Sequence, residues 1–280
     1  MKGIAQAQIL KVRGAEKNRQ EDFLVAEEPL EIRVAFEKNG IRHQRSVSVT
    51  MRTPGQDEEL ALGFLFTEGI ITGMDQVKSV GPVEVRWKEA RENVVAVELA
   101  DHLEMNFKKL ERHFYTASSC GVCGKASIEA VFVQGQFDLP DSQPLFPANV
   151  IHTLPEKLLR QQSVFDCTGG LHGAALFDKT GHLLLSREDV GRHNALDKLI
   201  GAQFQQDKLP ISESLVLVSG RAGFELVQKS IMAGIPVLAA VGAPSSLAVA
   251  LADEARMTLI GFLRNGQFNI YTHPERVIFE

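Results

Sequence analysis

Two of the three cysteines of the chain stand close together in the segment from Ser119 to Lys125, which reads SCGVCGK. Gly121 and Gly124, one after each cysteine, favour a mobile loop, because glycine adopts backbone conformations that are closed to other residues. The serines and Lys125 keep the thiols polar and near positive charge, which favours the nucleophilic thiolate. The spacing therefore predicts thiol chemistry or metal binding at Cys120 and Cys123; a structural metal knuckle or two thiols without a role are the alternatives.

Several chemistries are compatible with this cysteine pair. Cys120 and Cys123 with Cys167 and His172 would form a Cys3His zinc set, but the second half-site is irregular, and Cys167 is equally well explained as a small buried hydrophobe. A zinc deaminase needs a His-x-Glu before a Pro-Cys-x-x-Cys pair, and here Ser119 stands before Cys120 in place of proline, so this chemistry is poorly supported. A reversible disulfide is possible, although the usual thioredoxin setting is not evident. Nucleophilic thiolate chemistry fits best, including carriage of a sulfane sulfur as a persulfide.

A second group of polar residues lies where an apolar strand is predicted to pass into a helix, at Ser219-Gly220-Arg221. Gly220 permits close backbone approach, Ser219 can donate a hydrogen bond, and Arg221 can bind a phosphate with two hydrogen bonds. The segment is neither a Walker A motif nor a dinucleotide fingerprint, and an ordinary turn is the alternative. Because residues 243–246 form a similar junction, we expect both at one sheet edge, where they would bind an anionic ligand.

Titratable residues also precede another predicted helix. Arg192 and His193, together with Arg187, would form a mouth that attracts anions at a helix N-terminus, where the helix dipole favours negative charge. The alternative is a solvated start of the helix with Asp189 as its cap. His172 follows a glycine pair before an apolar strand, and a structural histidine explains it as well as a site residue does.

The first half of the chain is predicted to be mainly strands, because apolar and polar residues alternate there with a period of two. A hydroxyl, a proline and acidic residues from Thr53 onward predict a helix start. The expected elements are strands 30–36 and 41–51 around a turn at Asn39-Gly40, a helix from Thr53-Pro54 to about Gly69, strands 83–87 and 94–99, and an apolar stretch 103–115.

In the second half, apolar strands alternate with amphipathic helices, which predicts a three-layer α/β domain with a partly parallel sheet. The expected elements are a short helix opening at 153–156, a hairpin of 174–177 with 182–187, helix 194–204, strand 215–218, helix 224–233, strand 236–241, helix 245–256 and strand 258–263. The fold class is therefore α/β, or α+β over the whole chain. We expect a β-rich N-terminal domain over 1–115, a mobile cysteine loop over 116–125 and a cofactor-binding α/β domain over 126–280.

Composition narrows the class of protein. Hydrophobic residues make up 44% and charged residues 23% of the chain, as in ordinary globular proteins. The formal net charge of -5 gives no basic footprint, so nucleic acid is not an expected partner. Three cysteines do not make a disulfide framework, and the N-terminus has no apolar core of signal-peptide type. The most apolar stretch, 235–241, is too short to span a bilayer. We expect a cytoplasmic protein without membrane contact.

Taken together, the motifs resemble those of the FdhD/NarQ family, in the expected order and over nearly the whole chain. The segments that carry the resemblance are Arg52-Thr53-Pro54-Gly55, Glu59–Leu65, Ser119–Gly124, Thr168–His172, Glu188–Ala195, Ser219–Arg221 and Gly261–Arg264.

The resemblance implies a sulfurtransferase that acts as a sulfur carrier for formate dehydrogenase maturation. Such a protein accepts sulfur from an IscS-type cysteine desulfurase as a persulfide on the first loop cysteine, here Cys120, with Cys123 assisting transfer or resolving the persulfide. It passes the sulfur to the molybdenum cofactor, in its bis-molybdopterin guanine dinucleotide form, before insertion into formate dehydrogenase. The resemblance also implies a homodimer and a C-terminal domain similar to the cytidine deaminase fold, without a metal.

The resemblance places cofactor binding at the segment Phe262, Leu263, Arg264, Asn265, Gly266 and Gln267, to which the residue patterns add Ser219, Gly220, Arg221, Arg192, His193 and His172. GDP or GMP would be partial mimics of this cofactor. Two rival functions remain. One is a non-catalytic cofactor-delivery chaperone whose cysteines are structural or bind zinc, and the other is a dithiol oxidoreductase.

Overall fold

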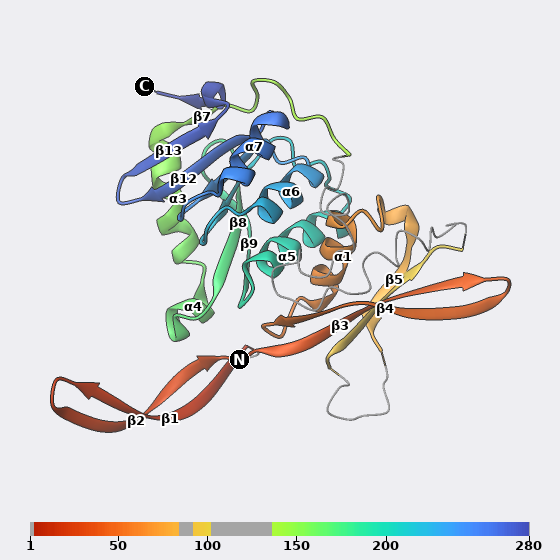
Figure 1. Cartoon of the computed structure of the whole chain (residues 1–280), viewed down its shortest axis with the longest axis horizontal. Helices are drawn as coiled ribbons and strands as arrows, with labels where there is room; N and C mark the ends of the chain where they lie inside the picture. The colour runs from red at the N-terminus through yellow and green to blue at the C-terminus, as the bar shows by residue number, and fades with distance from the viewer. Residues whose placement is uncertain (1–2, 84–91, 102–135, 280) are drawn as a thin grey trace.

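The computed structural model describes residues 3–83, 92–101 and 136–279, and two larger β-sheets organise it (Figure 1). The cysteine loop predicted at 116–125 and the apolar stretch predicted at 103–115 lie outside the described residues. The division into domains at these positions therefore stays a prediction.

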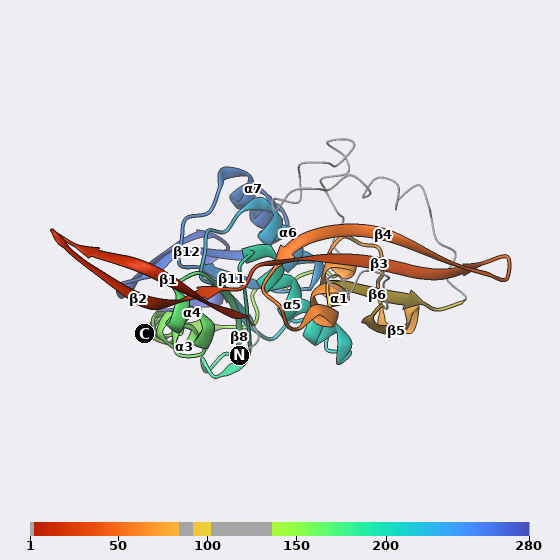
Figure 2. The same ribbon diagram turned by 90° about the horizontal axis from the view of Figure 1, so that it is seen from below.

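The chain begins with an antiparallel hairpin of β1 (Ile4–Arg13) and β2 (Glu16–Val25). Gly14 at its turn has φ 59°, a left-handed conformation that glycine adopts without strain. Both views show this hairpin projecting away from the rest of the molecule (Figures 1 and 2). We call residues 4–25 the arm. It is not among the elements predicted from the sequence.

The first larger sheet has the strand order β4-β3-β6-β5. β3 pairs antiparallel with β4 and parallel with β6, and the Asn39-Gly40 turn between β3 and β4 has φ angles of 54° and 73°. These angles confirm the predicted hairpin turn. The strands are β3 (Glu28–Lys38), β4 (Ile41–Arg52), β5 (Val77–Pro82) and β6 (Val94–Leu99), with a 3-10 turn η1 (Met74–Gln76) before β5.

The second larger sheet has the order β13-β12-β11-β10-β8-β9, in which β10, β11 and β12 run parallel. Its strands are β8 (His172–Phe177), β9 (Leu183–Asp189), β10 (Leu215–Val218), β11 (Val237–Ala240), β12 (Thr258–Arg264) and β13 (Gln267–Thr272). The helices around it are α3 (Ala148–Leu159), α4 (Ser163–Thr168), α5 (Arg192–Gln205), α6 (Phe224–Met232) and α7 (Ser246–Glu254). A small pair, β7 (Phe146–Pro147) and β14 (Val277–Ile278), and a 3-10 turn, η4 (Pro274–Arg276), complete the described elements.

Alternating residues of the second sheet enter two different cores, as the period of a strand requires. Leu215 and Leu217 pack with α3 on one face, whereas Val216 and Val218 pack with α5 and α6 on the other. Both faces of this sheet are therefore covered by helices. The expected α/β class with three layers is confirmed in this part of the chain, while the likeness to the cytidine deaminase fold stays a prediction.

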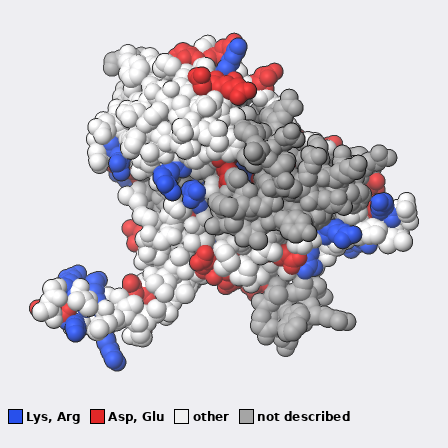
Figure 3. All heavy atoms as spheres, viewed as in Figure 1, with Lys and Arg blue, Asp and Glu red and all other residues white. Residues whose placement is uncertain are grey.

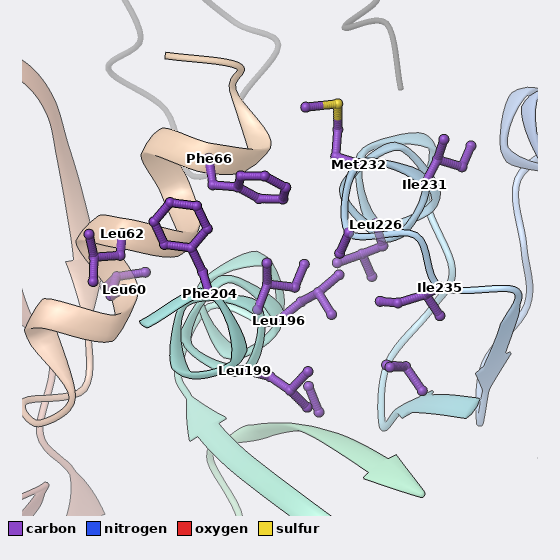
Figure 4. Close-up of a cluster of buried hydrophobic side chains, with 14 of the residues drawn as sticks. Leu60, Leu62, Phe66, Leu196, Leu199, Phe204, Leu226, Ile231, Met232 and Ile235 are labelled. Carbon is purple, nitrogen blue, oxygen red and sulfur yellow. The ribbon is translucent and has the colours of Figure 1, made fainter. Parts of the chain in front are cut away.

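Helix α1 (Asp57–Thr67), from the first half of the chain, joins the core of the second half. Phe66 of α1 lies against Phe204 of α5, with ring centroids 5.1 Å apart (Figure 4). The backbones touch where Gly63 meets α5, because a Cβ atom on Gly63 would lie 1.9 Å from the carbonyl oxygen of Asp197. Glycine at this crossing allows a closer approach than any side chain would permit.

Two predicted helix starts are wrong, and tertiary contacts explain both. The helix expected from Thr53-Pro54 begins at Asp57, because the Thr53 hydroxyl accepts the backbone N–H of Val190 in place of capping a helix. The helix expected to open at Thr153 begins at Ala148, and the Thr153 hydroxyl donates to the Val150 carbonyl inside that helix.

The structure also differs from the predicted elements at one strand of the first larger sheet and at one helix beside the second. The strand expected at 83–87 falls mostly outside the described residues, and the partner of β6 is instead β5 at Val77–Pro82. The short helix α4 was not predicted at 163–168, although the left-handed Gly169 that ends it is a common helix terminator.

Candidate functional site

The predicted polar junctions meet at one edge of the second sheet. β8 begins at His172 and β9 ends at Asp189, and these two residues are paired across the hairpin. The carboxyl ends of β10 and β11 lie at the same edge, because β8 runs antiparallel to β10 and pairs Ala174 with Val218. We call the loops at this edge the rim. Helices α5, α6 and α7 all begin there (Figure 1).

The rim loops are joined by main-chain hydrogen bonds. The Gly242 N–H donates to the Gly220 carbonyl at 2.9 Å, and the Phe262 N–H donates to the Gly242 carbonyl at 3.0 Å. A Cβ atom on Gly242 would lie 3.0 Å from Cγ of Arg221, so the loops are closely packed. The segments around Gly220, Gly242 and Phe262 therefore form one continuous border of the site.

Ser219 is fixed at the start of this border. Its N–H donates to the Gly173 carbonyl, and its hydroxyl accepts the Gly173 N–H, each at 2.9 Å. The hydroxyl proton is not used in this pair, so it can still be donated to a ligand. Ser219 is thus free to act as the donor predicted from the sequence, and it also anchors β8.

His172 and Arg192 stand beside Gly220. A Cβ atom on Gly220 would lie 3.3 Å from Nδ1 of His172 and 3.7 Å from Cδ of Arg192, so the absence of a side chain at position 220 leaves room for both groups. The buried Nε of Arg192 has no hydrogen-bond partner among the described residues. A buried guanidinium N–H without a partner is costly, and an anion at the rim would satisfy it.

The environment keeps His172 neutral. Burial lowers the pKa of His172, the charge of Arg192 lowers it further, and Asp189 opposes this only in part. A neutral imidazole offers one donor and one acceptor to a ligand. His193 has a different partner, because its Nε2 lies 3.2 Å from the Glu225 carboxylate.

The turn between β12 and β13 extends the rim. Asn265 and Gly266 have φ angles of 54° and 71°, the left-handed values of a two-residue hairpin turn. Phe262 also has a left-handed φ of 54°, and the strand register shifts between Gly261 and Arg264. The Arg264 guanidinium lies 5.7 Å from the centre of the Phe262 ring. A planar base could stack beside such a cation and ring.

Not every predicted residue faces the rim. Arg264, Asn265, Gly266 and Gln267 are exposed, whereas the Leu263 side chain is 1% exposed and packs in the core with α3. Arg187, which we expected in the anion-binding mouth, instead donates from Nη2 to Glu59 of α1 at 2.7 Å. Arg187 thus connects the two halves of the protein.

Known proteins resemble this chain over almost its whole length. The family model of the FdhD/NarQ family matches residues 25–278. The chain belongs to the FdhD/NarQ family. A sulfur carrier protein FdhD of Mycolicibacterium paratuberculosis is 51% identical over 258 residues, covering 91% of this chain and 92% of the relative. One from Streptomyces avermitilis is 47% identical over 272 residues, covering 96% and 94%.

The fold of this FdhD/NarQ member also matches a solved structure. The crystal structure of a formate dehydrogenase accessory protein from Desulfotalea psychrophila aligns with a TM-score of 0.75, covering 99% of this chain and 100% of the other, at 23% identity. The two chains share a fold. No helix within the described ranges is long and apolar enough to cross a membrane.

Of the three cysteines of this FdhD/NarQ member, one lies within the described residues and two lie outside them. Cys120 and Cys123 lie outside the described residues, so their geometry stays open. Cys167 is an exposed free thiol in α4, and the expectation of a small buried side chain is wrong. Within the described ranges, no three His, Cys, Asp or Glu residues come together in a group that could hold a metal ion.

The residues that support the rim from behind were not predicted from the sequence. Lys198 and Asp189 are almost completely buried, with Nζ 2.7 Å from Oδ2, and Lys198 also donates to the Thr53 carbonyl. Asn194 donates from its side chain to Asp189 and to the Met51 carbonyl. A lysine in a helix with an apolar stripe was the one sequence signal for a buried charge at Lys198. The partner at Thr53 could not be predicted, because only the fold brings Thr53 close to Lys198.

Proposed function

We propose that this chain is a sulfur carrier for formate dehydrogenase maturation. It accepts sulfur from a cysteine desulfurase on Cys120 and transfers it to the molybdenum cofactor bound at the rim. The proposal draws on the names of its relatives in the FdhD/NarQ family and on the Cys-x-x-Cys pair in the sequence. It defines the chain as a sulfurtransferase that works in the cytoplasm, as a homodimer.

The observation that carries the cofactor part of this proposal is the buried Nε of Arg192, which has no hydrogen-bond partner among the described residues and lies near His172 and the glycine-lined border. Arg221 is exposed on the same border, and Ser219 keeps a hydroxyl proton to donate. Two guanidinium groups, a hydroxyl and three helix N-termini suit the phosphates of a guanine dinucleotide. The Phe262–Gln267 turn would contact the guanine end.

Cys120 and Cys123 together account for every S–S bond that forms and breaks during sulfur transfer. The Cys120 thiolate attacks the terminal sulfur of the desulfurase persulfide; the S–S bond of the desulfurase breaks, and its cysteine leaves as a thiolate. Cys120 then carries the sulfur as a persulfide. Attack of the Cys123 thiolate on Sγ of Cys120 expels the sulfur as hydrosulfide and leaves a Cys120–Cys123 disulfide. A thiol reductant reopens this disulfide before the next cycle.

Mass spectrometry of the loop peptide tests the carrier function. After incubation with a cysteine desulfurase and cysteine, and trapping of thiols by alkylation, we expect a gain of one sulfur on the Cys120 peptide. Cys120→Ala should abolish this gain, whereas Cys167→Ala should leave it unchanged. Full sulfur loading of Cys120→Ala would exclude Cys120 as the carrier.

The rival delivery chaperone makes the opposite prediction. In that case no persulfide forms on either loop cysteine in the presence of a competent desulfurase, and the purified protein contains stoichiometric zinc. Metal analysis of the same preparation therefore separates the two functions. A dithiol oxidoreductase would instead turn over a disulfide substrate.

Nucleotide binding tests the rim separately from the cysteines. Titration calorimetry with GDP should show affinity that falls about tenfold or more in Arg221→Ala, because a phosphate then loses a charge-assisted contact of roughly 1.5–3 kcal/mol. Arg42→Ala serves as the matched control, since Arg42 is an exposed arginine on β4 of the other sheet. Equal GDP affinity in Arg221→Ala and the parent would remove Arg221 from the site.

A further inference from the structure

The arm exposes apolar side chains that the rest of the described chain does not cover. Leu10 is 55% exposed, Val12 56% and Phe23 45%, and all residues from 11 to 19 are exposed. A two-stranded hairpin alone is at best marginally stable in water. Its contact with the body is at the root, where Val25 lies against Gly170 and β2 packs on α4.

The register of the arm gathers these residues on one side. Leu10 pairs with Arg19, Val12 pairs with Lys17, and Gln6 pairs with Phe23. Directly paired residues point to the same face of a hairpin, and positions two apart share that face. Leu10 and Val12 therefore lie next to each other on one face, opposite the basic side chains of Arg19 and Lys17. Phe23 lies on the same face nearer the root, beyond the polar pair of Gln8 and Glu21. We call this side the row face.

The charge of the arm is opposite to that of the remaining chain. The tip, residues 11–19, contains the basic residues Lys11, Arg13, Lys17 and Arg19 and one acidic residue, Glu16. The whole chain has 30 Lys and Arg against 35 Asp and Glu, so 26 basic and 34 acidic residues remain outside the tip. Figure 3 shows the blue side chains gathered on the arm. The tip is thus complementary in charge to the body of another copy of this chain.

The size of the arm also favours a second copy. Strands of about ten residues give a ribbon roughly 33 Å long and about 10 Å wide, so one face covers roughly 330 Å². One arm on an unrelated partner would bury roughly 650 Å² in total, which is small for a specific complex, whereas two reciprocal arms would bury roughly 1,300 Å², within the standard range.

We propose that the arm is the dimerisation element of this chain, with its row face laid reciprocally on the body of a second copy. The contact is isologous, so each arm and each body is used once. The arm is rooted beside α4 and the loop that leads to His172, so dimerisation would border the rim of each copy. The interface itself is independent of sulfur transfer, and its test needs neither a desulfurase nor a nucleotide.

Sedimentation velocity of the full chain over a concentration series tests the proposal. We expect a dimer for the parent, and a dimer affinity at least tenfold weaker in Leu10→Ser/Phe23→Ser and in Lys17→Glu/Arg19→Glu. The matched controls are Leu184→Ser/Leu247→Ser, which change equally exposed leucines of β9 and α7, and Lys179→Glu. These controls should keep the affinity of the parent. A monomeric parent at 100 µM, or arm variants as dimeric as the parent, would overturn the proposal.

Hydrogen exchange of the unmodified chain guards against a misfolded variant. Amides of β1 and β2 should be protected above the dissociation constant of the dimer and should exchange at least tenfold faster well below it, while those of β10 keep their protection. Arm amides that exchange at the same rate at both concentrations would show that the dimer, if present, uses another surface. Sulfur loading of Cys120, measured on the same arm variants, reports on the sulfur-carrier function separately.

Discussion

Individual buried charges stabilise the corner between β9 and α5. Asp189 accepts hydrogen bonds from the N–H groups of Thr53 and Gly191 and pairs with the Lys198 ammonium. The Lys198 ammonium in turn binds the Thr53 carbonyl at 3.0 Å. Because the neighbouring residues of α5 are Arg192 and His193, the same corner sets where these two groups stand at the rim.

Asp189→Asn should therefore destabilise the protein strongly. The substitution keeps the volume but leaves the Lys198 ammonium buried without its counter-charge, which costs about 3–5 kcal/mol in comparable buried pairs. Urea denaturation measures the free energy of unfolding. Arg42→Ala, which removes the exposed pair with Glu98, is the control and should cost about 1 kcal/mol or less. A loss below about 1 kcal/mol in Asp189→Asn would contradict this assignment.

His172 gives the stability a pH dependence of known sign. Its pKa in the folded protein is lowered from the ordinary value of 6.5, chiefly by burial. As the pH falls below 6.5, the unfolded chain takes up the proton first, so this residue lowers the free energy of unfolding. The contribution is fully present above pH 6.5 and is lost as the pH falls through the lowered pKa.

We expect His172→Gln to reduce the loss of stability between pH 7.5 and 5.5. The measurement is the difference in unfolding free energy between parent and variant at each pH, because other groups titrate equally in both. His182→Gln, at an exposed position, is the control. An identical pH dependence in the parent and in His172→Gln would show that burial of this imidazole has no energetic consequence.

At the scale of elements, α1 and α5 are held together by backbone contact. A Cβ atom on Gly63 would lie 1.9 Å from the Asp197 carbonyl oxygen, and one on Gly201 would lie 1.8 Å from that of Glu59. Behind this crossing, the buried Lys229 ammonium binds the Asp197 carboxylate at 2.8 Å and the Thr67 hydroxyl at 2.9 Å. The crossing therefore joins α1, α5 and α6.

Gly63→Ala should separate α1 from α5. We expect a loss of about 1–3 kcal/mol or more from overpacking, despite the better helix propensity of alanine. Thermal or urea unfolding measures it. Gly223→Ala is the control, because a Cβ atom there would meet nothing within 4 Å. An unchanged stability of Gly63→Ala would mean that the helices can move apart freely.

Elements were predictable where local pattern and tertiary role agree. The strands at Leu215–Val218 and Thr258–Arg264 carry continuous apolar residues because both of their faces are buried, and they were found nearly to the residue. The start of α1 was not, because the hydroxyl of Thr53 serves the distant Val190. The arm was missed although Gly14 and the alternation around Ile9 were visible, since an exposed hairpin has no core face to mark it.

The parts of the site that a single segment forms were predictable, whereas the contacts between distant segments were not. Strand-to-helix junctions such as Ser219-Gly220-Arg221 are local, and the parallel order of β10 and β11 brings them to one edge. The approach of His172 and Arg192 to Gly220 joins three segments and needs the whole sheet. The pairing of Arg187 with Glu59 joins two halves of the chain, which no local spacing indicates.

At the scale of the whole molecule, one hydrophobic cluster runs from the first sheet to the second. It contains Ile32 and Val97 of the first sheet, Leu62 of α1, and Leu226 and Leu238 of the second half. A shared core of this kind makes separate unfolding of either half costly, because each would expose apolar surface that the other now covers.

We therefore expect the two larger sheets and the helices that share this core to unfold as one unit. Native-state hydrogen exchange should give similar opening free energies for the slowest amides of α1 and of β11, within about 1 kcal/mol. Opening of α1 several kcal/mol below β11 would contradict this expectation and would favour two independently stable halves.

The border of the rim is tied together by its backbone: Gly220 to Gly242, and Gly242 to Phe262. Its scaffold consequently does not depend on which exposed side chains stand at positions 221, 264 or 267. Mutation can exchange those side chains one at a time and alter what the edge selects, while the loops keep their places. A family of proteins with this backbone can therefore acquire new ligand specificity by side-chain substitution alone, without a change in the fold of the loops.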